Sequence, residues 1–362
     1  MAGWVARLQQ TRPGRAWGRL RRALGFGRTG YGARRDRERE RYAEVAVVHD
    51  LPPSFHYWSR THVRPMLREQ GFDNPAAFFA DCAQRQATGR EAGDSVRVLS
   101  VGAGNCDLEV AVVELLQRRG VDRVHIECLE LNPAMLRRGR ALATARGVAA
   151  QLTFTECDVN RWTAPAARFG VVMANHSLHH VVELERLFDQ VRRGLRPGGV
   201  IAVNDVIGRN GHQRWPEALA ELRHLWAELS AGHRYNHQLR RQEDEFLDWD
   251  CSGEGFEGIR AQDILPLLLE RFHVHRFVPF GNLIDPFVDR AFGPNFRPDD
   301  DDRDRAFLDR VHARDEELLA RGALTPTHLY GVFGAEPCAA PALSRGLRPA
   351  ACVRRADAAP RG

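Results

Sequence analysis

The sequence reads VLSVGAGNCD from Val98 to Asp107, and an apolar stretch, Leu108–Leu116, follows directly. The apolar run before the glycines has the character of a buried strand, and the stretch after them has that of a helix. Gly102 and Gly104 allow a turn too tight for side chains. Because glycine has no Cβ, a ligand can lie against the backbone there. A strand, a glycine turn and a helix N-terminus together predict a cofactor site at this point.

Strands and helices alternate beyond this turn. Candidate strands are residues 96–101, 124–131, 152–156, 171–175 and 200–205, and candidate helices between them are 108–119, 133–146 and 183–195. Short apolar strands joined by helical crossovers predict an α/β fold with a doubly wound, mostly parallel sheet. Two later strand candidates, 274–280 and 329–334, raise the expected number of strands to seven.

The chain divides into segments of different composition. We expect a basic, disordered arm at 1–40, a helical N-terminal cap at 41–95, a main domain at 96–336 and a disordered tail at 337–362. The main domain comprises a cofactor-binding core (96–208), a substrate cap or insertion (209–272) and the final strands (273–336). In the arm, Trp17, Leu20 and Leu24 share one helical face, which leaves weak contact with a membrane surface as an alternative to an unstructured arm.

Composition excludes several classes of protein. The net charge of +5 comes from arginine alone and is concentrated in the arm, so the core shows no signature of nucleic-acid binding. The seven cysteines are scattered and form no Cys-x-x-Cys pair, which argues against disulfides and zinc. No apolar run approaches the ~20 residues of a membrane-spanning helix. The start lacks the apolar core of a secretory signal, so we expect a cytoplasmic protein.

Polar residues at the strand ends indicate which cofactor fits. Glu130 ends the second strand, where a carboxylate can accept both ribose hydroxyls, and Asp158 after the third suits an exocyclic amine. A dinucleotide would require a third glycine near Asp107, and a carboxylate there would repel a pyrophosphate. A zwitterionic ligand with an amino group and a sulfonium fits an acidic residue better.

These features resemble the class I S-adenosylmethionine-dependent methyltransferases of the small-molecule type. The resemblance rests on Val101–Gly104 with Asp107, Leu129–Leu136, Cys157–Val159, Ser177–Val181 and Leu195–Gly199. It implies a Rossmann-like sheet whose last strand is antiparallel, and S-adenosyl-L-methionine as cofactor. The cofactor-binding residues that it implies are Gly102, Gly104, Asp107, Glu130, Leu131, Asp158, Val159 and Asn175. Ser100 stands where the family often has an acid, and Asp107 is the candidate to replace that acid in binding the methionine amine.

The sequence predicts the catalytic and acceptor-binding residues less specifically than the cofactor-binding residues. His179, His180 and Asp205 are the catalytic candidates, as a base or as groups that orient the nucleophile. The spacing of His176, His179 and His180 also permits a metal site, but no metal is expected, and a substrate or base role stands level with structural hydrogen bonding. Polar and aromatic segments outside the core could equally form a recognition wall or a self-contained polar cap. Their substrate candidates, with His176 from the core, are Tyr57, Trp58, His176, Arg209, His212, Tyr235 and His237.

The predicted function is transfer of a methyl group to an oxygen, nitrogen or carbon of a small metabolite. Two other classes of function remain as alternatives. One is an RNA methyltransferase anchored by the arginine-rich arm. The other is a non-catalytic cofactor-binding module whose insertion serves as an interaction surface. The acceptor and the oligomeric state are left open.

Overall fold

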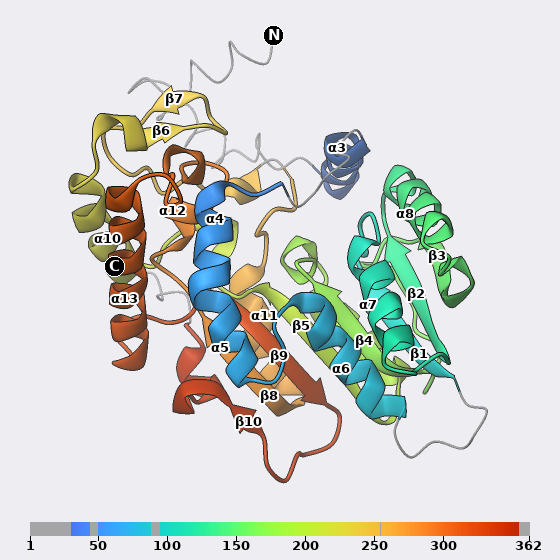
Figure 1. Cartoon of the computed structure of the whole chain (residues 1–362). Helices are drawn as coiled ribbons and strands as arrows, with labels where there is room; N and C mark the ends of the chain where they lie inside the picture. The colour runs from blue at the N-terminus through green and yellow to red at the C-terminus, as the bar shows by residue number, and fades with distance from the viewer. Residues whose placement is uncertain (1–29, 44–49, 88–94, 254, 355–362) are drawn as a thin grey trace, which may run out of the picture.

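The computed structural model describes residues 30–43, 50–87, 95–253 and 255–354 (Figure 1). Its centre is an eight-stranded sheet of order β10-β8-β9-β5-β4-β1-β2-β3. The strands are β1 (Val96–Val101), β2 (Val124–Glu130), β3 (Leu152–Glu156), β4 (Phe169–Asn175), β5 (Leu195–Val206), β8 (His273–Phe280), β9 (His328–Gly334) and β10 (Ala342–Leu343). A separate hairpin pairs β6 (Tyr235–Asn236) with β7 (Arg241–Gln242). Within the large sheet β9 runs antiparallel to both of its neighbours, and the other strands run parallel to one another.

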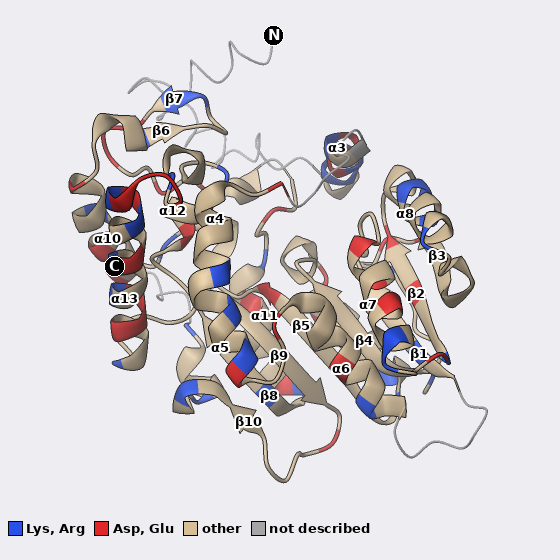
Figure 2. Ribbon diagram, in the orientation of Figure 1, with Lys and Arg blue, Asp and Glu red and all other residues tan. Residues whose placement is uncertain are grey.

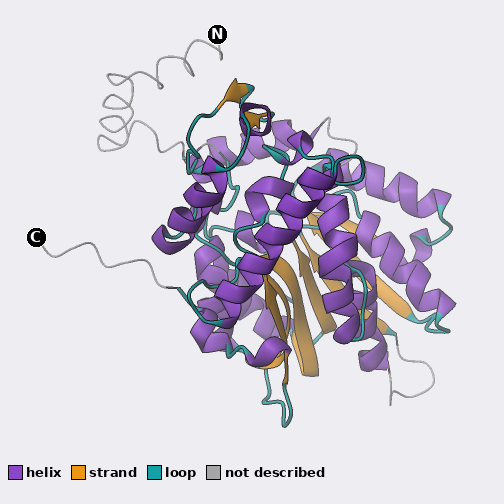
Figure 3. Ribbon diagram, turned by 60° about the vertical axis from the view of Figure 1, so that its left-hand side comes forward, coloured by secondary structure: helices purple, strands orange, loops and turns teal. Residues whose placement is uncertain are grey.

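Helices cover both faces of the sheet (Figure 3). Alternate residues of β4 belong to two different hydrophobic cores because successive side chains of a strand point to opposite faces. Val171 and Met173 join the core that includes α6 and α7, and Val172 and Ala174 join the core of α9 and α11. The helices are α3 (Tyr31–Ala43), α4 (Pro53–Trp58), α5 (Arg64–Glu69), α6 (Pro75–Ala87), α7 (Asp107–Arg118), α8 (Pro133–Ala145), α9 (Leu184–Gly194), α10 (Pro216–Ala227), α11 (Ala261–Arg271), α12 (Asp285–Val288) and α13 (Asp302–Ala320).

A helical unit lies beside the β8–β9 end of the sheet (Figure 1). It contains α4, α10, α12 and α13, and aromatic contacts join its parts. Trp226 packs edge-on against Phe292 at 4.8 Å between ring centroids, and Phe296 stacks on Phe307 at 5.6 Å. These aromatic side chains bury large apolar areas and belong to the same hydrophobic core as α6 and α7, so the unit is continuous with one face of the sheet. Among the described residues, no helix combines the length and the apolar character needed to cross a bilayer.

The mostly parallel α/β sheet with an antiparallel late strand is confirmed, but the strand count of seven is wrong. The eighth strand, β10, lies in the tail expected to be disordered, where Leu343 pairs with Phe277 of β8. The same tail also buries Cys352 in the core of α9 and α11. The Ala/Pro/Arg-rich composition of this segment wrongly predicted disorder. The segment is ordered because it pairs with the open edge of the sheet.

The arm expected at 1–40 also differs in its described part. Residues 31–43 form helix α3, which side chains fix to distant segments: Tyr31 donates to Asp158 (2.6 Å) and Arg34 donates to the carbonyl of Gly255 (2.7 Å). Residues 1–29 lie outside the described residues. In the segment 41–95, α6 packs on β1, β4 and β5, so part of the predicted cap is a covering helix of the sheet.

Candidate functional site

The glycine turn after β1 packs closely against the end of β2 and the loop after β4. Gly102 and Gly104 both have positive φ angles, +67° and +57°, which side chains disfavour. The amide of Gly102 donates to the carbonyl of Leu129 at 2.9 Å, which ties the turn to the end of β2. A Cβ on Gly102 would lie 2.7 Å from the Cβ of Ser177, in the loop after β4. The turn thus fits against two neighbouring strand ends with no room for a side chain.

Gly102→Ala is expected to lower the free energy of unfolding by about 2 kcal/mol more than Gly120→Ala, because it adds a clash to the cost of a positive φ. Gly120 is the matched control: its φ is +75° and nothing lies within 4 Å of a Cβ built there. Urea unfolding of both variants measures the difference. Equal losses would mean that Ser177 moves aside without cost.

Glu130 connects the glycine turn to the start of α8. Its two carboxylate oxygens accept from the backbone amides of Gly104 (3.0 Å) and Asn132 (2.8 Å). Burial raises the pKa of Glu130, and these backbone amides oppose the increase. A carboxylate oxygen has lone pairs for more than one donor, so each oxygen can still accept a ligand hydroxyl. The geometry suits a vicinal diol.

Two further carboxylates each keep one buried oxygen without a hydrogen-bond partner among the described residues: Asp158 Oδ2 and Glu109 Oε2. The other oxygen of Asp158 accepts from Tyr31, and the other oxygen of Glu109 accepts from the hydroxyl of Ser100 at 2.6 Å. Burial raises the pKa of Glu109 to about 7. Since buried acceptors without partners are costly, a ligand that donates to them would be stabilised.

A pocket at the carboxyl ends of β1–β4 unites these groups. It is lined by all the residues predicted to bind the cofactor: Gly102, Gly104, Asp107, Glu130, Leu131, Asp158, Val159 and Asn175. Two of the predicted acceptor or catalytic residues, His176 and His180, also line it. Figure 2 shows acidic residues at this end of β2 and α7. Because the lining carboxylates would repel a phosphate and attract a cation, the pocket suits a positively charged ligand.

Helix α3 forms part of the pocket wall through Glu38, Arg39 and Tyr42. Asn132 donates to the carbonyl of Arg39 at 3.0 Å, and Arg138 donates to that of Tyr42 at 3.0 Å. The sequence analysis assigned residues 31–40 to a disordered arm and missed their part in the pocket wall. Their high charge density predicts disorder, and only a few of their side chains contact the rest of the protein. Glu109 was also missed, although it follows the glycine turn closely.

Residues 98–199 match the family described as a methyltransferase domain. This segment of the chain is therefore similar to methyltransferase domains. Among similar curated proteins, the 27-O-demethylrifamycin SV methyltransferase of Amycolatopsis mediterranei (strain S699) is 25% identical over 197 residues, which are 51% of this chain and 70% of that protein. A ubiquinone/menaquinone biosynthesis C-methyltransferase of Azotobacter vinelandii (strain DJ / ATCC BAA-1303) is 29% identical over 107 residues, or 30% of this chain and 41% of that relative's length.

One similar solved structure is the geranyl diphosphate C-methyltransferase from Streptomyces coelicolor A3(2). It is 14% identical in sequence and has a TM-score of 0.40. The match covers 71% of this chain and 78% of that chain.

Next to the pocket, histidines and carboxylates form a buried cluster. Asp205 is fully buried, and it lies 2.5 Å from Nδ1 of His179 while it accepts from the amides of Ser177 and Leu178. Burial lowers the pKa of His179, but Asp205 and then Glu257 outweigh burial and raise it. His180 lies between Glu257, 3.8 Å from Nε2, and Glu38 of α3, 3.0 Å from Nδ1.

The catalytic candidates therefore differ in how far they lie from the pocket. His180 lines the pocket, whereas His179 and Asp205 lie behind it and are buried. Asp205 fixes the ring of His179 and the loop that carries His176 and Ser177. Their roles in catalysis stay predictions.

The structure separates most of the predicted acceptor residues from the pocket. Tyr57 and Trp58 both lie on α4 in the helical unit. Tyr57 donates to Asp309 of α13, and Trp58 packs on Phe280 of β8. Tyr235 and His237 belong to the β6–β7 region, where His237 contacts Asn295. Arg209 lies over the ring of Trp215, and His212 joins the histidine cluster through Glu257 at 2.9 Å. The polar and aromatic composition of these segments could not predict that they lie in different parts of the structure.

Proposed function

We propose that this protein transfers the methyl group of S-adenosylmethionine to an oxygen, nitrogen or carbon of a small metabolite. The observation that carries the proposal is the acidic pocket at the strand ends, where one buried oxygen each of Asp158 and Glu109 makes no hydrogen bond within the described residues. The names of two relatives support a small organic acceptor: one acts on 27-O-demethylrifamycin SV, and the other belongs to ubiquinone and menaquinone biosynthesis.

Three carboxylates of the pocket have distinct parts in holding the cofactor. Glu130 would accept the ribose hydroxyls, Asp158 Oδ2 the exocyclic amine of adenine, and Glu109 Oε2 the methionine ammonium group. The bound cofactor supplies an electrophilic methyl group on a sulfonium, so the chain need not create a reactive species. What the chain must do is hold a nucleophile in line with the methyl group and exclude water.

The segments that cover the pocket would exclude water from it. Tyr42 of α3 and Phe256 line it, and Phe256 also contacts Tyr31 at 5.4 Å between ring centroids. On the acceptor side, His176 and His180 line the pocket at the end of β4. The backbone of His176 has a φ of +48°, and its amide donates to the carbonyl of Asn204 at 2.7 Å. A residue held in this rare conformation points to a functional constraint at that loop.

The test is transfer of a trideuterated methyl group from labelled S-adenosylmethionine by the full chain. Phenols, hydroxyquinones, amines and enolic carbon acids serve as acceptors, and mass spectrometry reads the product. We expect one class of acceptor to gain the label, and Glu130→Ala to abolish the gain at low cofactor concentration. S-adenosylhomocysteine binding with no labelled product from any acceptor would favour the non-catalytic module. Label found in RNA, and lost on removal of residues 1–29, would favour the RNA methyltransferase.

A further inference from the structure

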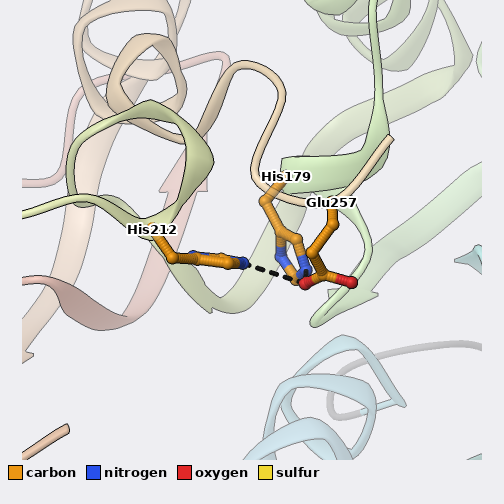
Figure 4. Close-up of side chains that lie close together, drawn as sticks. All are labelled: His179, His212 and Glu257. Atoms are coloured by element: carbon orange, nitrogen blue, oxygen red, sulfur yellow. Dashed lines mark hydrogen bonds and ion pairs between the residues drawn. The ribbon is translucent and has the colours of Figure 1, made fainter. Parts of the chain in front are cut away.

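Three side chains from separate segments converge beside the pocket: His179, His212 and Glu257 (Figure 4). The Nε2 atom of His212 lies 2.9 Å from Oε1 of Glu257, and Nε2 of His179 lies 3.4 Å from the same oxygen. One ligand atom from each residue lies within 4.8 Å of the other two. Neighbouring ligands of a cation with bonds of about 2.1 Å are about 3.0 Å apart in an octahedron and about 3.4 Å apart in a tetrahedron. The cluster is therefore close to the size of a metal site.

The surrounding contacts orient these side chains. Asp205 holds Nδ1 of His179, which turns Nε2 toward Glu257. Metal-binding histidines commonly use a carboxylate in this way to fix the ring and its tautomer. Backbone hydrogen bonds join the three segments as well: Ile259 donates to the carbonyl of His179 at 3.0 Å, and Gly211 donates to that of Gly258 at 2.8 Å.

The backbone of His212 adds an independent observation. Its φ is +54°, a conformation that costs a non-glycine residue roughly 1–2 kcal/mol. The preceding Gly211 packs so tightly that a Cβ there would collide with the carboxylate of Asp250. The chain thus accepts local strain in order to place an imidazole next to Glu257, and such strain gathers at functional sites.

We propose that His179, His212 and Glu257 bind one divalent first-row transition-metal cation. Two imidazoles and one carboxylate are the donor set that such cations prefer over Mg²⁺. The charges of Asp205 and Glu257 balance a divalent cation when both imidazoles are neutral. This revises the expectation, drawn from the histidines at 176–180, that the chain holds no metal. Glu257 and His212 come from segments that the spacing of those histidines does not reveal.

Binding of Co²⁺ to the full chain, after removal of metals with a chelator, tests the proposal without reference to methyl transfer. We expect one Co²⁺ per chain, with visible d–d absorption, and competition by Zn²⁺ but not by Mg²⁺. His212→Ala and Glu257→Gln are each expected to weaken binding at least 100-fold. His237→Ala is the matched control, because His237 lies in the β6–β7 region and contacts Asn295, and its affinity should equal that of the wild type.

Binding of S-adenosylhomocysteine shows whether each variant is folded. If a variant fails to bind it, paramagnetically shifted proton resonances of the wild-type Co²⁺ complex replace the mutational test, and two imidazole signals are expected. Co²⁺ binding that survives His212→Ala, absence of saturable binding, or equal loss in His237→Ala would each overturn the proposal. Failure of methyl transfer would leave this result unaffected, so the two proposals fail separately.

Discussion

Glu130→Ala is expected to lower the affinity for S-adenosylhomocysteine by about 100-fold, because two hydrogen bonds from ribose hydroxyls to a charged group are lost. The effect is large because Glu130 is partly enclosed at the end of β2 and holds both sides of the pocket. Its oxygens accept from the amides of Gly104 and Asn132, so the substitution also releases the glycine turn and the start of α8. Isothermal titration calorimetry measures the change.

Two further variants separate ligand contact from loop release. Glu130→Gln keeps the size of the side chain and one acceptor oxygen, so an intermediate loss of about tenfold is expected. Glu127→Ala is the matched control on the same strand, because Glu127 pairs with Arg168 at the surface, 3.2 Å away. Unchanged affinity in Glu130→Ala would refute the assignment of the ribose site.

Glu109→Gln is expected to weaken S-adenosylhomocysteine binding about tenfold or more and to leave 5′-methylthioadenosine binding unchanged. The second ligand has the same adenosine and sulfur but no amino-acid group. Glu109 accepts from Ser100, which stands where the family often has an acid. We propose that Glu109, in the first turn of α7, supplies the negative charge that β1 lacks. Its second oxygen is buried and has no hydrogen-bond partner among the described residues.

The affinity for S-adenosylhomocysteine should also rise with pH between 6 and 8. The pKa of Glu109 is raised to about 7 by burial, so at pH 6 its carboxyl group is mostly neutral. A ligand ammonium group favours the carboxylate, and binding below pH 7 therefore releases a proton. Raising the pH removes the cost of that release, and Glu109→Gln should flatten the dependence.

The choice between Glu109 and Asp107 is settled by comparing their variants. Asp107 also lines the pocket, but its side chain is exposed, whereas Glu109 is 2% exposed. Glu114→Gln is the control on the same helix, since Glu114 pairs with Arg146 at 3.3 Å. If Asp107→Asn weakens binding and Glu109→Gln does not, the ammonium site belongs to Asp107, as the sequence alone predicts.

Local sequence was sufficient to predict the core of the sheet. Strands β1 and β3 begin and end at the predicted residues. The reason is physical: β1 is mostly apolar because it is largely buried inside the sheet, and β3, at the sheet edge, alternates apolar and polar residues. Segments that pack through a few side chains were predicted less well. Helix α3 and strand β10 have polar or small residues in sequence and become ordered through contacts with distant segments.

The sequence by itself determined the cofactor side of this protein. Parallel strands end at one edge of the sheet, so residues that follow Val101, Leu129 and Glu156 must meet there, whatever the rest of the chain does. The acceptor side was decided by tertiary structure. The cluster of His179, His212 and Glu257 depends on two connections, the one between β5 and α10 and the one before α11, lying against the loop that follows β4. No local pattern encodes that contact, because it follows from how long connections pack rather than from a repeated period.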